Sequence, residues 1–327
     1  MKTNTEELVL SALLDSNGAF VPAVTLTASL QISSAQLTQH IETLRQQGAV
    51  IVSSADSGYC LQEAPDRLYP ILIQNGLHTA TVAQELHYFP RLDSTNRLAK
   101  ELAEQHAADG TVVLAEEQTA GRGRLDRAWL APAFSSILCS VIFYPDLAPA
   151  SLFRLTMMAS VAVVNAINHA CNIPAKIKWP NDVYLGTKKV CGILTEFSGH
   201  QDLIRYAVVG IGINVNNDFT DHPEIESIAT SLRAESGRKI SRLNVLKAVL
   251  EELDRQYQLL AAGRADEVRR AWEQHALILG KRVTFYSGDK TLTGTAQGID
   301  EDGHLMLIDE NGARQEIISG DVSLRLE

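Results

Sequence analysis

An arginine- and glycine-rich segment over residues 121–129 carries three guanidinium groups within six residues: Arg122, Arg124 and Arg127. Arginine supplies permanent, fork-shaped donors for phosphate or carboxylate groups. Gly121 and Gly123 permit positive φ angles and let the backbone approach a ligand closely. A solvated basic turn would explain an isolated triplet of this kind. In a chain whose formal net charge is −10, however, we interpret the segment as a binding site for an anion.

The segment from Lys178 to Asp182 carries a second set of phosphate-compatible groups. Pro180 forces the residue before it out of the helical region, which predicts an extended strand end that turns polar side chains outward. Lys178 and Asp182 on such a turn can hold a phosphate and a Mg²⁺ ion together, because Mg²⁺ prefers carboxylate and phosphate oxygens. The alternative is a surface salt bridge, which is worth only roughly 0–1 kcal/mol.

Two glycines interrupt the apolar run over residues 210–215, where they cost packing unless something must approach the backbone closely. Lys189 stands just before another apolar run, which is a common position for a basic side chain. Neither segment has the spacing of a dinucleotide-binding fingerprint, and the chain has no GxxxxGK(S/T) motif. We therefore expect phosphate to be held by arginine and lysine side chains rather than by a glycine loop that caps a helix.

Asp93, Ser94, Thr95 and Asn96 stand at an expected junction between a strand and a helix. Ser94 is a suitable helix N-cap, and capping explains one such residue better than four in a row. Hydroxyl and amide groups at a helix N-terminus can also bind a polar heterocycle or a carboxylate. Gln118 is a further polar contact of this kind.

Residues 1–63 are predicted to form a winged helix-turn-helix. Apolar periodicity predicts helices over residues 8–14, 22–30 and 33–47, followed by a β-hairpin over 49–61 that would be the wing. Ser33 and Gln36 predict a capping box at the start of the third helix. Gly48 ends that helix.

DNA binding by this domain is left open by its charge, because residues 1–63 hold two basic and six acidic side chains. The third helix begins with hydroxyl and amide groups that suit base edges but neutralise almost no phosphate. The candidate DNA-binding residues are Ser33, Ser34, Gln36, Thr38, Gln39 and His40. The alternative is a module for regulation or protein packing.

Beyond a linker near Pro65, residues 67–275 are predicted to form a mixed α/β region. Strands are expected over 111–115, 137–143, 176–179, 190–197 and 206–215, and helices over 94–105, 152–170, 243–260 and 265–275. Residues 276–327 change to short strands over 283–286, 292–296, 305–308, 316–318 and 322–326, which predict a small β-barrel. The predicted fold class is α+β with three domains.

The composition indicates a soluble cytoplasmic protein with no membrane partner. An apolar content of 45% and a charged content of 21% are ordinary for a globular chain. The first residues lack the pattern of a signal peptide, and the most apolar run, 157–167, is too short to span a bilayer. The four cysteines have no metal-ligand spacing and are expected to be reduced core residues.

In their order along the chain, these segments resemble the family of bifunctional biotin–protein ligases and biotin operon repressors, the BirA family. The resemblance covers essentially the full length, and its motifs are residues 93–96, 121–124, 178–182, 189–194 and 210–214. It implies a winged helix-turn-helix, a central ligase domain similar to class II synthetases and a C-terminal SH3-like barrel. Such ligases use Mg²⁺ to join biotin and ATP into biotinyl-5′-AMP, and then pass the biotinyl group to a lysine of a carrier protein.

The resemblance also implies a role for each matching residue. Biotin would contact Ser94, Thr95, Asn96, Gln118, Arg122, Gly123, Arg124, Lys189, Gly192 and Gly210. ATP would contact Arg122, Arg124, Arg127, Trp129, Lys178, Asn181 and Asn214. Asp182 would hold Mg²⁺, and the catalytic residues would be Lys189, Arg124 and Lys178. Residues 229–232 resemble the loop on the adenine side, and Asp126 departs from the glycine that is usual in the family.

The implied partners are the biotin carboxyl carrier protein of acetyl-CoA carboxylase, operator DNA with biotinyl-5′-AMP as corepressor, and a second copy of the chain in a ligand-promoted homodimer. Two other functions stay open: a ligand-sensing repressor without ligase activity, and a lipoate–protein ligase, which shares the catalytic architecture. Lys178, Asp182 and Lys189 together argue against a sensor that has lost its chemistry. ATP–pyrophosphate exchange driven by biotin but not by lipoate would exclude the lipoate ligase.

Overall fold

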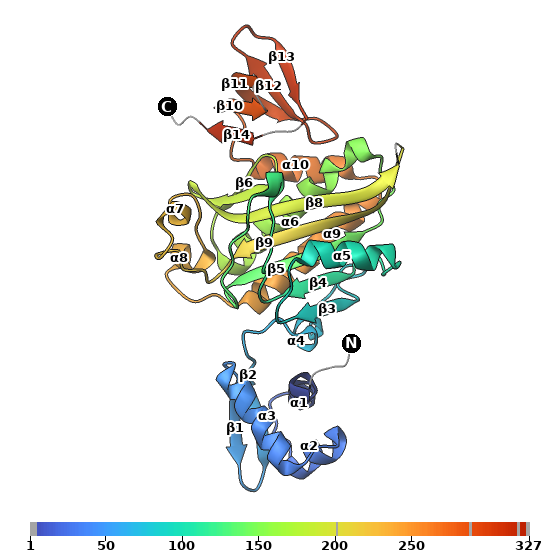
Figure 1. Ribbon diagram of the computed structural model, residues 1–327, viewed down its shortest axis with the longest axis vertical. Coiled ribbons are helices and arrows are strands. Elements are labelled where there is room, and N and C mark those ends of the chain that lie inside the picture. The colour runs from blue at the N-terminus through green and yellow to red at the C-terminus, as the bar shows by residue number, and fades with distance from the viewer. Residues whose placement is uncertain (1–4, 201, 288–289, 319–320, 325–327) are drawn as a thin grey trace. The chain divides into compact units, whose positions relative to one another are not determined.

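The computed structural model describes residues 5–200, 202–287, 290–318 and 321–324. Its contacts divide the chain into two compact units, Met1–Leu77 and His78–Glu327. Figure 1 shows the helices and strands of both units, and the same labels are used below.

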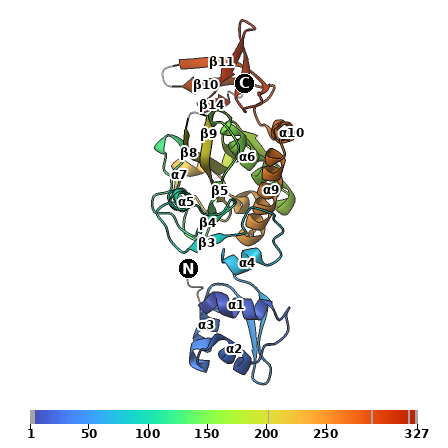
Figure 2. The ribbon, with the colours of Figure 1, turned by 90° about the vertical axis from the view of Figure 1, so that its right-hand side faces the viewer.

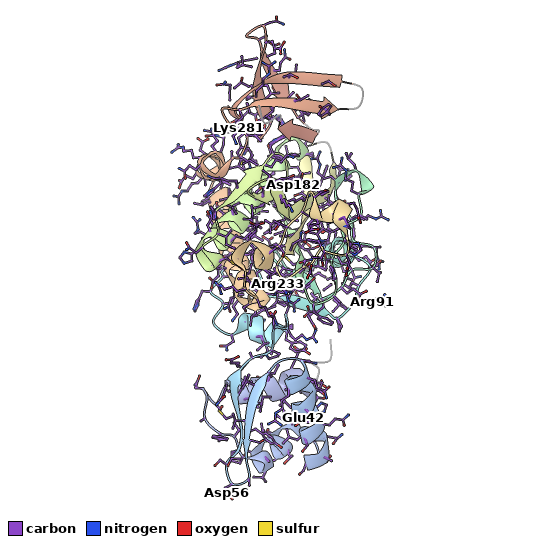
Figure 3. All side chains as sticks on the ribbon, turned by 90° about the vertical axis from the view of Figure 1, so that its left-hand side faces the viewer. Glu42, Asp56, Arg91, Asp182, Arg233 and Lys281 are labelled. Carbon is purple, nitrogen blue, oxygen red and sulfur yellow. The ribbon has the colours of Figure 1, made fainter. Side chains whose placement is uncertain are left out.

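The first unit consists of three helices and a β-hairpin, followed by a short helix. Its elements are α1 (Thr5–Leu14), α2 (Ala23–Leu30), α3 (Ser34–Gln46), β1 (Val50–Ser54), β2 (Gly58–Glu63) and α4 (Pro70–Gln74). Leu37, Ile41 and Leu44 lie at helical spacing on α3 and are buried, as the sequence predicts. Asp56 lies at the tip of the β1–β2 hairpin (Figure 3).

Ser33 begins α3 through the predicted capping box. The Ser33 hydroxyl accepts the backbone N–H of Gln36 at 3.2 Å, and the Ser33 N–H donates to Gln36 Oε1 at 2.9 Å. These two bonds satisfy donors that the first turn of a helix would otherwise leave without partners. The expected three helices and hairpin are therefore confirmed.

Among the described residues of the second unit, a seven-stranded sheet has the order β3-β4-β5-β9-β8-β7-β6. Its strands are β3 (Leu86–Phe89), β4 (Val112–Ala115), β5 (Ser136–Phe143), β6 (Ala175–Lys178), β7 (Asp182–Leu185), β8 (Lys188–His200) and β9 (Leu203–Asn214). The β3–β4 pair is parallel and the other neighbours are antiparallel. All eight residues of β5 are buried, which matches a central strand covered on both faces.

Helices cover both faces of this sheet. The longer ones are α5 (Thr95–Glu104), α6 (Phe153–Cys171), α9 (Arg242–Ala261) and α10 (Ala265–His275), with short helices α7 (Pro223–Glu226) and α8 (Leu232–Ser236). Figure 2 shows α5 on one face of the sheet and α6 and α9 on the other. The main core therefore lies between the sheet and the α6–α9 layer.

Helix α6 is longer than the apolar run over residues 157–167, which is by itself too short to span a membrane. The helical stretch Pro149–Cys171 has the length and composition that could cross a membrane, yet 67% of its most apolar window is buried inside the structure. It packs against α9, α10 and the sheet. A core helix passes the same test of length and composition, and the packing places α6 in that role.

The C-terminal strands form a separate antiparallel sheet within the second unit. The order is β13-β12-β11-β10-β14, with β10 (Arg282–Ser287), β11 (Lys290–Ile299), β12 (Leu305–Asp309), β13 (Arg314–Ile317) and β14 (Asp321–Leu324). Trp179 Nε1 donates to the carbonyl of Gly303 at 3.1 Å, and its ring lies beside those of Phe153 and Phe285. The buried indole of Trp179 thus joins this sheet to the end of β6.

The predicted strands and long helices of residues 67–318 are confirmed within a few residues, whereas β3, β7 and the short helices α4, α7 and α8 are not predicted. The far end of the strand expected over 322–326 lies outside the described residues. β3 and β7 each contain only four residues. Segments this short carry too little periodicity to separate a strand from a turn.

His275 makes the stability of the second unit sensitive to acid. Its Nε2 lies 2.9 Å from Asn165 Oδ1, whose amide nitrogen donates to Glu252. Burial, and then the charge of Lys176, lower the pKa of His275 below its ordinary value of 6.5. The unfolded chain therefore binds the proton first, and the free energy of unfolding should fall as the pH decreases through the region of that ordinary value.

Denaturant unfolding at pH 8 and pH 5.5 checks this expectation. His275→Gln keeps a donor to Asn165 but cannot titrate, so it should lose less stability between the two pH values than the native chain. His169→Gln, which changes an exposed histidine on the same helix as Asn165, is the control. Equal losses in the native chain and His275→Gln would contradict the prediction.

Candidate active site

A cavity of about 460 Å³ opens over the middle of the seven-stranded sheet. All of the residues predicted to contact biotin, ATP or Mg²⁺ line it. They are Ser94, Thr95, Asn96, Gln118, Arg122, Gly123, Arg124, Arg127, Trp129, Lys178, Asn181, Asp182, Lys189, Gly192, Gly210 and Asn214. The fold therefore brings five separate stretches of sequence to one place.

One wall of the cavity is the N-terminus of α5. Ser94 caps this helix by accepting the N–H of Arg97, as predicted. The backbone N–H of Thr95 donates to Gln118 Oε1 at 2.7 Å, which fixes the Gln118 side chain against the helix end. Thr95 and Gln118 thus form one polar surface, although 23 positions separate them in the chain.

The arginine- and glycine-rich segment folds back on itself beside this wall. The N–H of Gly123 donates to the carbonyl of Arg127 at 2.8 Å, and the N–H of Trp129 donates to the carbonyl of Gly121 at 3.0 Å. Neither glycine uses the positive φ that it permits; Leu125 between them and Trp129 has a positive φ, 55°. Gly121 is instead closely packed, because a Cβ there would lie 3.0 Å from the carbonyl oxygen of Trp129, which would have to shift slightly. The Asp126 side chain lies outside the described residues.

The β6–β7 hairpin presents Lys178, Asn181 and Asp182 to the cavity. Lys178 and Asp182 are directly opposite each other in the register. Each has another partner, because Lys178 Nζ donates to Tyr184 Oη at 3.2 Å and Asp182 Oδ1 lies 2.6 Å from Lys189 Nζ. A simple Lys178–Asp182 surface salt bridge therefore does not explain this segment.

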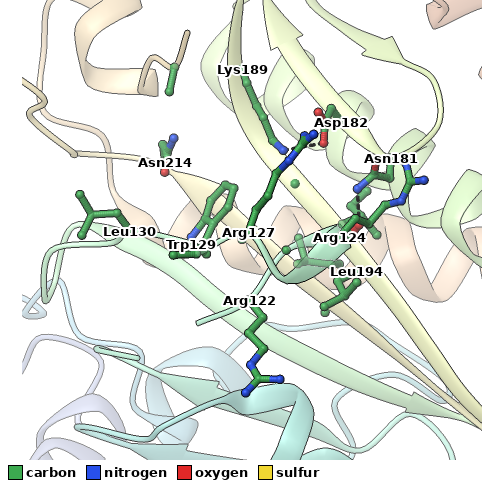
Figure 4. Close-up of a pocket in the computed structure, with 18 of the residues that line it drawn as sticks. Arg122, Arg124, Arg127, Trp129, Leu130, Asn181, Asp182, Lys189, Leu194 and Asn214 are labelled. Carbon is green, nitrogen blue, oxygen red and sulfur yellow. Dashed lines mark hydrogen bonds and ion pairs between the residues drawn. The ribbon is translucent and has the colours of Figure 1, made fainter. Parts of the chain in front are cut away.

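Arg124 joins the glycine-rich segment to the hairpin. Arg124 Nη1 donates to Asn181 Oδ1 at 3.2 Å, and Asn181 Nδ2 donates to the carbonyl of Ile193 at 2.8 Å (Figure 4). Because the Asn181 amide is held at both ends, it positions the guanidinium over the hairpin.

Lys189 stands at the centre of the cationic groups. Its backbone N–H donates to the carbonyl of Ile228, and its carbonyl accepts the N–H of Thr230, both at 2.9 Å. These bonds attach residues 228–230 to the start of β8. The Lys189 ammonium also lies 5.5 Å from the centroid of the Trp129 ring. Figure 4 shows the guanidinium of Arg127 extending toward Lys189 and Asp182.

Arg122 is predicted to bind the ligand, but its side chain does not lie with the cationic groups around Lys189. Its side chain points away from Lys189, Asp182 and Arg124 (Figure 4). It lines a second, neighbouring pocket together with Glu196, and its charge contributes to lowering the pKa of Glu196. Arg122 thus lines both cavities, with its side chain directed away from the group around Lys189.

Gly192 and Gly212 face each other across β8 and β9 and form a flat floor for the Trp129 ring. A Cβ at Gly212 would lie 2.8 Å from Trp129 Cε2, and one at Gly192 would lie 3.0 Å from Trp129 Cζ3. Real Cβ atoms do not approach other atoms at 2.8 Å, so a side chain at Gly212 would displace the indole, and one at Gly192 would crowd it. Close approach therefore explains the glycines that interrupt these strands.

Among the described residues that line the cavity, three buried side-chain atoms have no hydrogen-bond partner: Trp129 Nε1, Asp182 Oδ1 and Asn214 Oδ1. Asp182 Oδ1 has the ion pair with Lys189, which leaves Trp129 Nε1 and Asn214 Oδ1. The other end of the Asn214 amide donates to the carbonyl of Thr230 at 3.1 Å. An unpaired buried donor or acceptor costs about 1–3 kcal/mol. One donor and one acceptor are thus available to a polar ligand beside the Trp129 ring.

Gly212→Ala should displace the Trp129 indole from this floor. Trp179 and Trp272, the other two tryptophans, are buried, so a red shift of the intrinsic fluorescence would report on Trp129. We also expect weaker nucleotide binding, because the ring carries one of the two available polar atoms. Gly298→Ala is the control, since its new methyl group would meet only the carboxylate end of Glu273 at 3.3 Å. An unshifted spectrum in Gly212→Ala would contradict this packing.

A polar network lies behind the Thr95 wall. Asn96 Nδ2 donates to Glu196 Oε2 at 2.8 Å, and Lys100 Nζ donates to Glu196 Oε1 at 2.7 Å. Burial opposes the charge on Glu196, but the hydrogen bonds from Lys100 and Asn96 outweigh it and lower the pKa of this carboxyl. A Cβ at Gly210 would lie 2.1 Å from Asn96 Oδ1, so this glycine makes room for the network. Asn96 therefore lies in the wall with its amide already engaged.

Several lining residues are absent from the sequence-based set. They are mostly apolar, and include Leu130, Ile193, Ile211, Phe219 and Ile228. In the sequence such residues look the same as core residues. Tyr184 and Tyr286 also line the cavity, and Tyr286 comes from β10 of the C-terminal sheet. Only the tertiary structure brings that strand to the site.

The candidate DNA-binding residues lie at the start of α3. Ser33 and Gln36 are engaged in the capping box, and Thr38 Oγ1 donates to the carbonyl of Ser34. His40 Nδ1 lies 3.1 Å from Glu6 on α1, whereas Gln39 is exposed. Arg45 donates to the carbonyl of Ile51 at 2.6 Å.

The fold and the cavity define a mixed α/β protein whose cavity is lined by cationic side chains. Residues 88–214 match the Biotin/lipoate A/B protein ligase family, and residues 278–325 match the Biotin protein ligase C terminal domain. A biotin protein ligase from Aquifex aeolicus, solved in complex with biotin and ATP, is similar with a TM-score of 0.63 and 33% identity. That similarity covers 74% of this chain and 99% of the Aquifex chain.

Two full-length relatives define the family more closely. The chain is 35% identical over 327 residues to the Bifunctional ligase/repressor BirA of Bacillus subtilis, with 99% of this chain and 100% of that protein covered. It is 30% identical to the Bifunctional ligase/repressor BirA of Escherichia coli, with 99% of each chain covered. The chain therefore belongs to the BirA family of bifunctional ligase/repressors.

Proposed function

We propose that the chain is an ATP-dependent biotin–[acetyl-CoA-carboxylase] ligase that forms biotinyl-5′-AMP and transfers the biotinyl group to a lysine of the biotin carboxyl carrier protein. The observation that carries the proposal is the convergence of the predicted residues on one cavity. Family membership and the names of the full-length relatives support it.

The first step joins two anions. A biotin carboxylate oxygen attacks the α-phosphorus of ATP, a phosphorus–oxygen bond forms, and pyrophosphate leaves. Lys189, Lys178, Arg124 and Arg127 line the cavity and supply the positive charge that screens the approach. Preorganised cations of this kind stabilise charge that develops in the transition state without reorganising at the moment of reaction.

The second step needs no nucleophile from the enzyme. The amine of the carrier lysine attacks the acyl carbon of the adenylate, an amide forms, and AMP leaves while the amine loses a proton. The buried thiol of Cys139 lines the cavity, but burial raises its pKa to about 12, so it stays protonated and is a poor nucleophile. The enzyme acts by binding and orientation.

Mg²⁺ would neutralise part of the charge on the phosphates of bound ATP. Among the described lining residues, Asp182 is the only one with a carboxylate. A single carboxylate suits Mg²⁺, which usually binds one or two carboxylates together with substrate phosphates. Asp182 would hold the ion, and Lys189, 2.6 Å away, would hold Asp182.

The ligand contacts follow the arrangement of the cavity. The biotin ring would lie against Ser94, Thr95 and Gln118, and its carboxylate would reach Lys189. The nucleotide would lie toward Asn181, Trp129 and Asn214. For the domains we propose a winged helix-turn-helix over 1–63, a class II synthetase-like ligase domain over 67–275 and an SH3-like barrel over 276–327. A cytoplasmic location is proposed with them.

Biotin-dependent labelling of a purified carrier domain tests the ligase proposal directly. The intact chain, ATP, Mg²⁺ and biotin should produce a labelled carrier, and biotin should drive ATP–pyrophosphate exchange. Exchange driven by lipoate in place of biotin would indicate a lipoate ligase. If neither vitamin drives exchange while biotin still binds, the chain is a ligand sensor.

Repression of transcription is the second candidate function, because the first unit has three helices and a hairpin and the full-length relatives are named ligase/repressors. The negative charge of residues 1–63 argues for weak binding to DNA. Arg45, the only arginine or lysine among the described residues of 5–63, is engaged with the β1 backbone and with Glu42. Dimer formation promoted by biotinyl-5′-AMP would compensate by presenting two such units.

A gel shift with the intact chain tests repression. Operator DNA should be retained in the presence of biotinyl-5′-AMP and less so without it. Binding should weaken steeply between low and moderate salt, because phosphate contacts release counterions. Equal retention of unrelated DNA would contradict specific repression.

A further inference from the structure

Two carboxylates of the C-terminal sheet meet at one histidine nitrogen. His304 Nδ1 lies 3.0 Å from Asp300 Oδ2 and 3.0 Å from Glu316 Oε1. These three atoms all lie within 4.8 Å of one another. The His304 side chain is largely buried, Asp300 is partly exposed and Glu316 is exposed. None of the three residues lines the cavity of the candidate active site, so they form a separate cluster.

The pairing of three neighbouring strands brings these side chains together. Asp300 follows β11 and His304 precedes β12, and the backbone N–H of Asp300 donates to the carbonyl of His304 at 3.0 Å. In the β12–β13 pair, Met306 lies opposite Glu316. Because His304 comes two positions before Met306, His304 and Glu316 lie on the same face of the sheet. The cluster is therefore positioned by the backbone.

A second turn in the same sheet shows that the backbone does not need this cluster. Residues 309–313 repeat the arrangement of residues 300–304. In each turn, Oδ1 of the first aspartate accepts two backbone N–H groups at 2.8–2.9 Å, and the fourth residue is a glycine with a positive φ. The second turn has Ala313 where the first has His304. The turn therefore needs one oxygen of its aspartate, and it explains neither the histidine nor the glutamate.

One imidazole nitrogen and two carboxylate oxygens are a ligand set for a divalent transition metal ion. Ca²⁺ and Mg²⁺ favour oxygen ligands alone, whereas Zn²⁺ binds histidine together with carboxylates. Ligands about 2.0–2.1 Å from a tetrahedral zinc ion lie roughly 3.3 Å apart, so the two distances of 3.0 Å need only a small change. The alternative is an ion pair, in which a single N–H at Nδ1 must serve both carboxylates.

We propose that Asp300, His304 and Glu316 bind one divalent transition metal ion of the zinc class, with water in the remaining position. This ion would be separate from the Mg²⁺ that accompanies ATP at Asp182. The two N–H groups that donate to Asp300 Oδ1 would hold its other oxygen toward the ion, as outer hydrogen bonds do in metal sites. The ion would connect β11, β12 and β13.

The same turn attaches the C-terminal sheet to the rest of the second unit. Asp302 Oδ1 accepts the Ser151 hydroxyl at 2.6 Å and lies 3.0 Å from Arg154 Nη2, and the carbonyl of Gly303 accepts the indole N–H of Trp179. An ion bound by the first and last residues of the turn would hold this attachment. We therefore expect the ion to raise the temperature of thermal unfolding, as a ligand of the folded chain does.

Metal titration of the intact chain tests the site after a chelator has removed bound ions. Calorimetry at about pH 7.5, where imidazole is mostly neutral, counts the equivalents of Zn²⁺ bound. Co²⁺ is the second probe, because it absorbs visible light much more strongly in a four-coordinate site than in water. His304→Ala and Glu316→Gln should each bind one equivalent of Zn²⁺ fewer than the native chain, and should lose the Co²⁺ band and the thermal shift.

The difference between native and variant chains isolates this cluster, because Zn²⁺ taken up at Asp182 would be retained in both variants. His304→Ala should fold, since Ala313 occupies the same position in the second turn. Asp309→Asn, which alters the aspartate of that second turn, is one control. His87→Gln, which removes the histidine that pairs with Glu85, is the other. Both controls should keep the native number of equivalents.

Equal uptake of Zn²⁺ by the native chain and by either cluster variant would overturn the proposal and leave the three residues as an ion pair. Loss of the same equivalent in Asp309→Asn or His87→Gln would also overturn it, because the ion would then not be bound by these three side chains. Neither result affects the ligase proposal, which biotin-dependent exchange tests independently.

Discussion

Lys189→Ala should lower biotin-dependent ATP–pyrophosphate exchange by about 100- to 1,000-fold, the typical effect of removing one preorganised donor to developing charge. Lys189 is attached to residues 228–230 by two backbone hydrogen bonds, and its ammonium faces Asp182 at 2.6 Å. Its position is therefore fixed before the substrates bind. The loss should appear in the adenylation rate and in faster dissociation of biotinyl-5′-AMP.

The substitution also leaves the Asp182 carboxylate without its cation, in a cavity that must receive two anions. Adding Asp182→Asn to the Lys189→Ala chain separates the loss of the ammonium from the repulsion between the Asp182 carboxylate and the substrates. The second substitution removes this repulsion but does not restore the ammonium. We expect the double variant to recover part of the lost biotin affinity but little of the rate. Lys188→Ala, one position earlier on β8 and outside the lining of the cavity, should behave as the native chain. Native turnover and adenylate release in Lys189→Ala would contradict the role that we give to it.

Arg242→Met should lower the free energy of unfolding by about 3–5 kcal/mol, because it leaves a buried carboxylate without its counter-ion. The side chains of Arg242 and Glu116 are fully buried and form an ion pair. Arg242 Nη1 also donates to the carbonyl of Ser136 at 3.2 Å, and Tyr88 Oη donates to Glu116 at 3.3 Å. The pair joins the start of α9 to the end of β4 and the start of β5, and Glu116 is two positions before Gln118.

The same principle predicts that removing both charges lowers the free energy of unfolding much less than removing Arg242 alone. A chain with Arg242→Met and Glu116→Met should recover most of the lost stability in denaturant unfolding, since two apolar groups of similar size can replace a buried pair. Arg264→Met, which breaks an exposed pair with Glu267, is the control and should change stability by only about 0–1 kcal/mol. A small loss in Arg242→Met, comparable to this control, would show that the buried pair is not needed for stability.

Glu116 and Glu196 show why the site is only partly readable in the sequence. Each is an acidic residue near the end of a strand, a position that carries no motif of its own. Their roles arise because Arg242, 126 positions from Glu116, and Asn96, 100 positions from Glu196, meet them in space. Arg122 is the opposite case. Its motif correctly predicts that it lines the cavity, but not the direction in which its guanidinium points.

The sequence by itself determines the order of the elements and the residues that can do chemistry. Periodicity, caps and turn residues act over a few positions, so the helices of the first unit and the long strands of the second can be predicted from local patterns. The motifs at residues 93–96, 121–124 and 178–182 are likewise local, and each brings its own polar or charged groups.

The tertiary structure alone decides how those groups are paired. Strands β8 and β9 bring Gly192 opposite Gly212 and make a floor for Trp129, and the N-terminus of α5 meets the side chain of Gln118. Hydrogen-bond direction, charge pairing and close packing depend on atoms that are distant in sequence but adjacent in space. Local patterns therefore predict most of the polar residues of the cavity, and only the folded chain fixes which of them pair with one another.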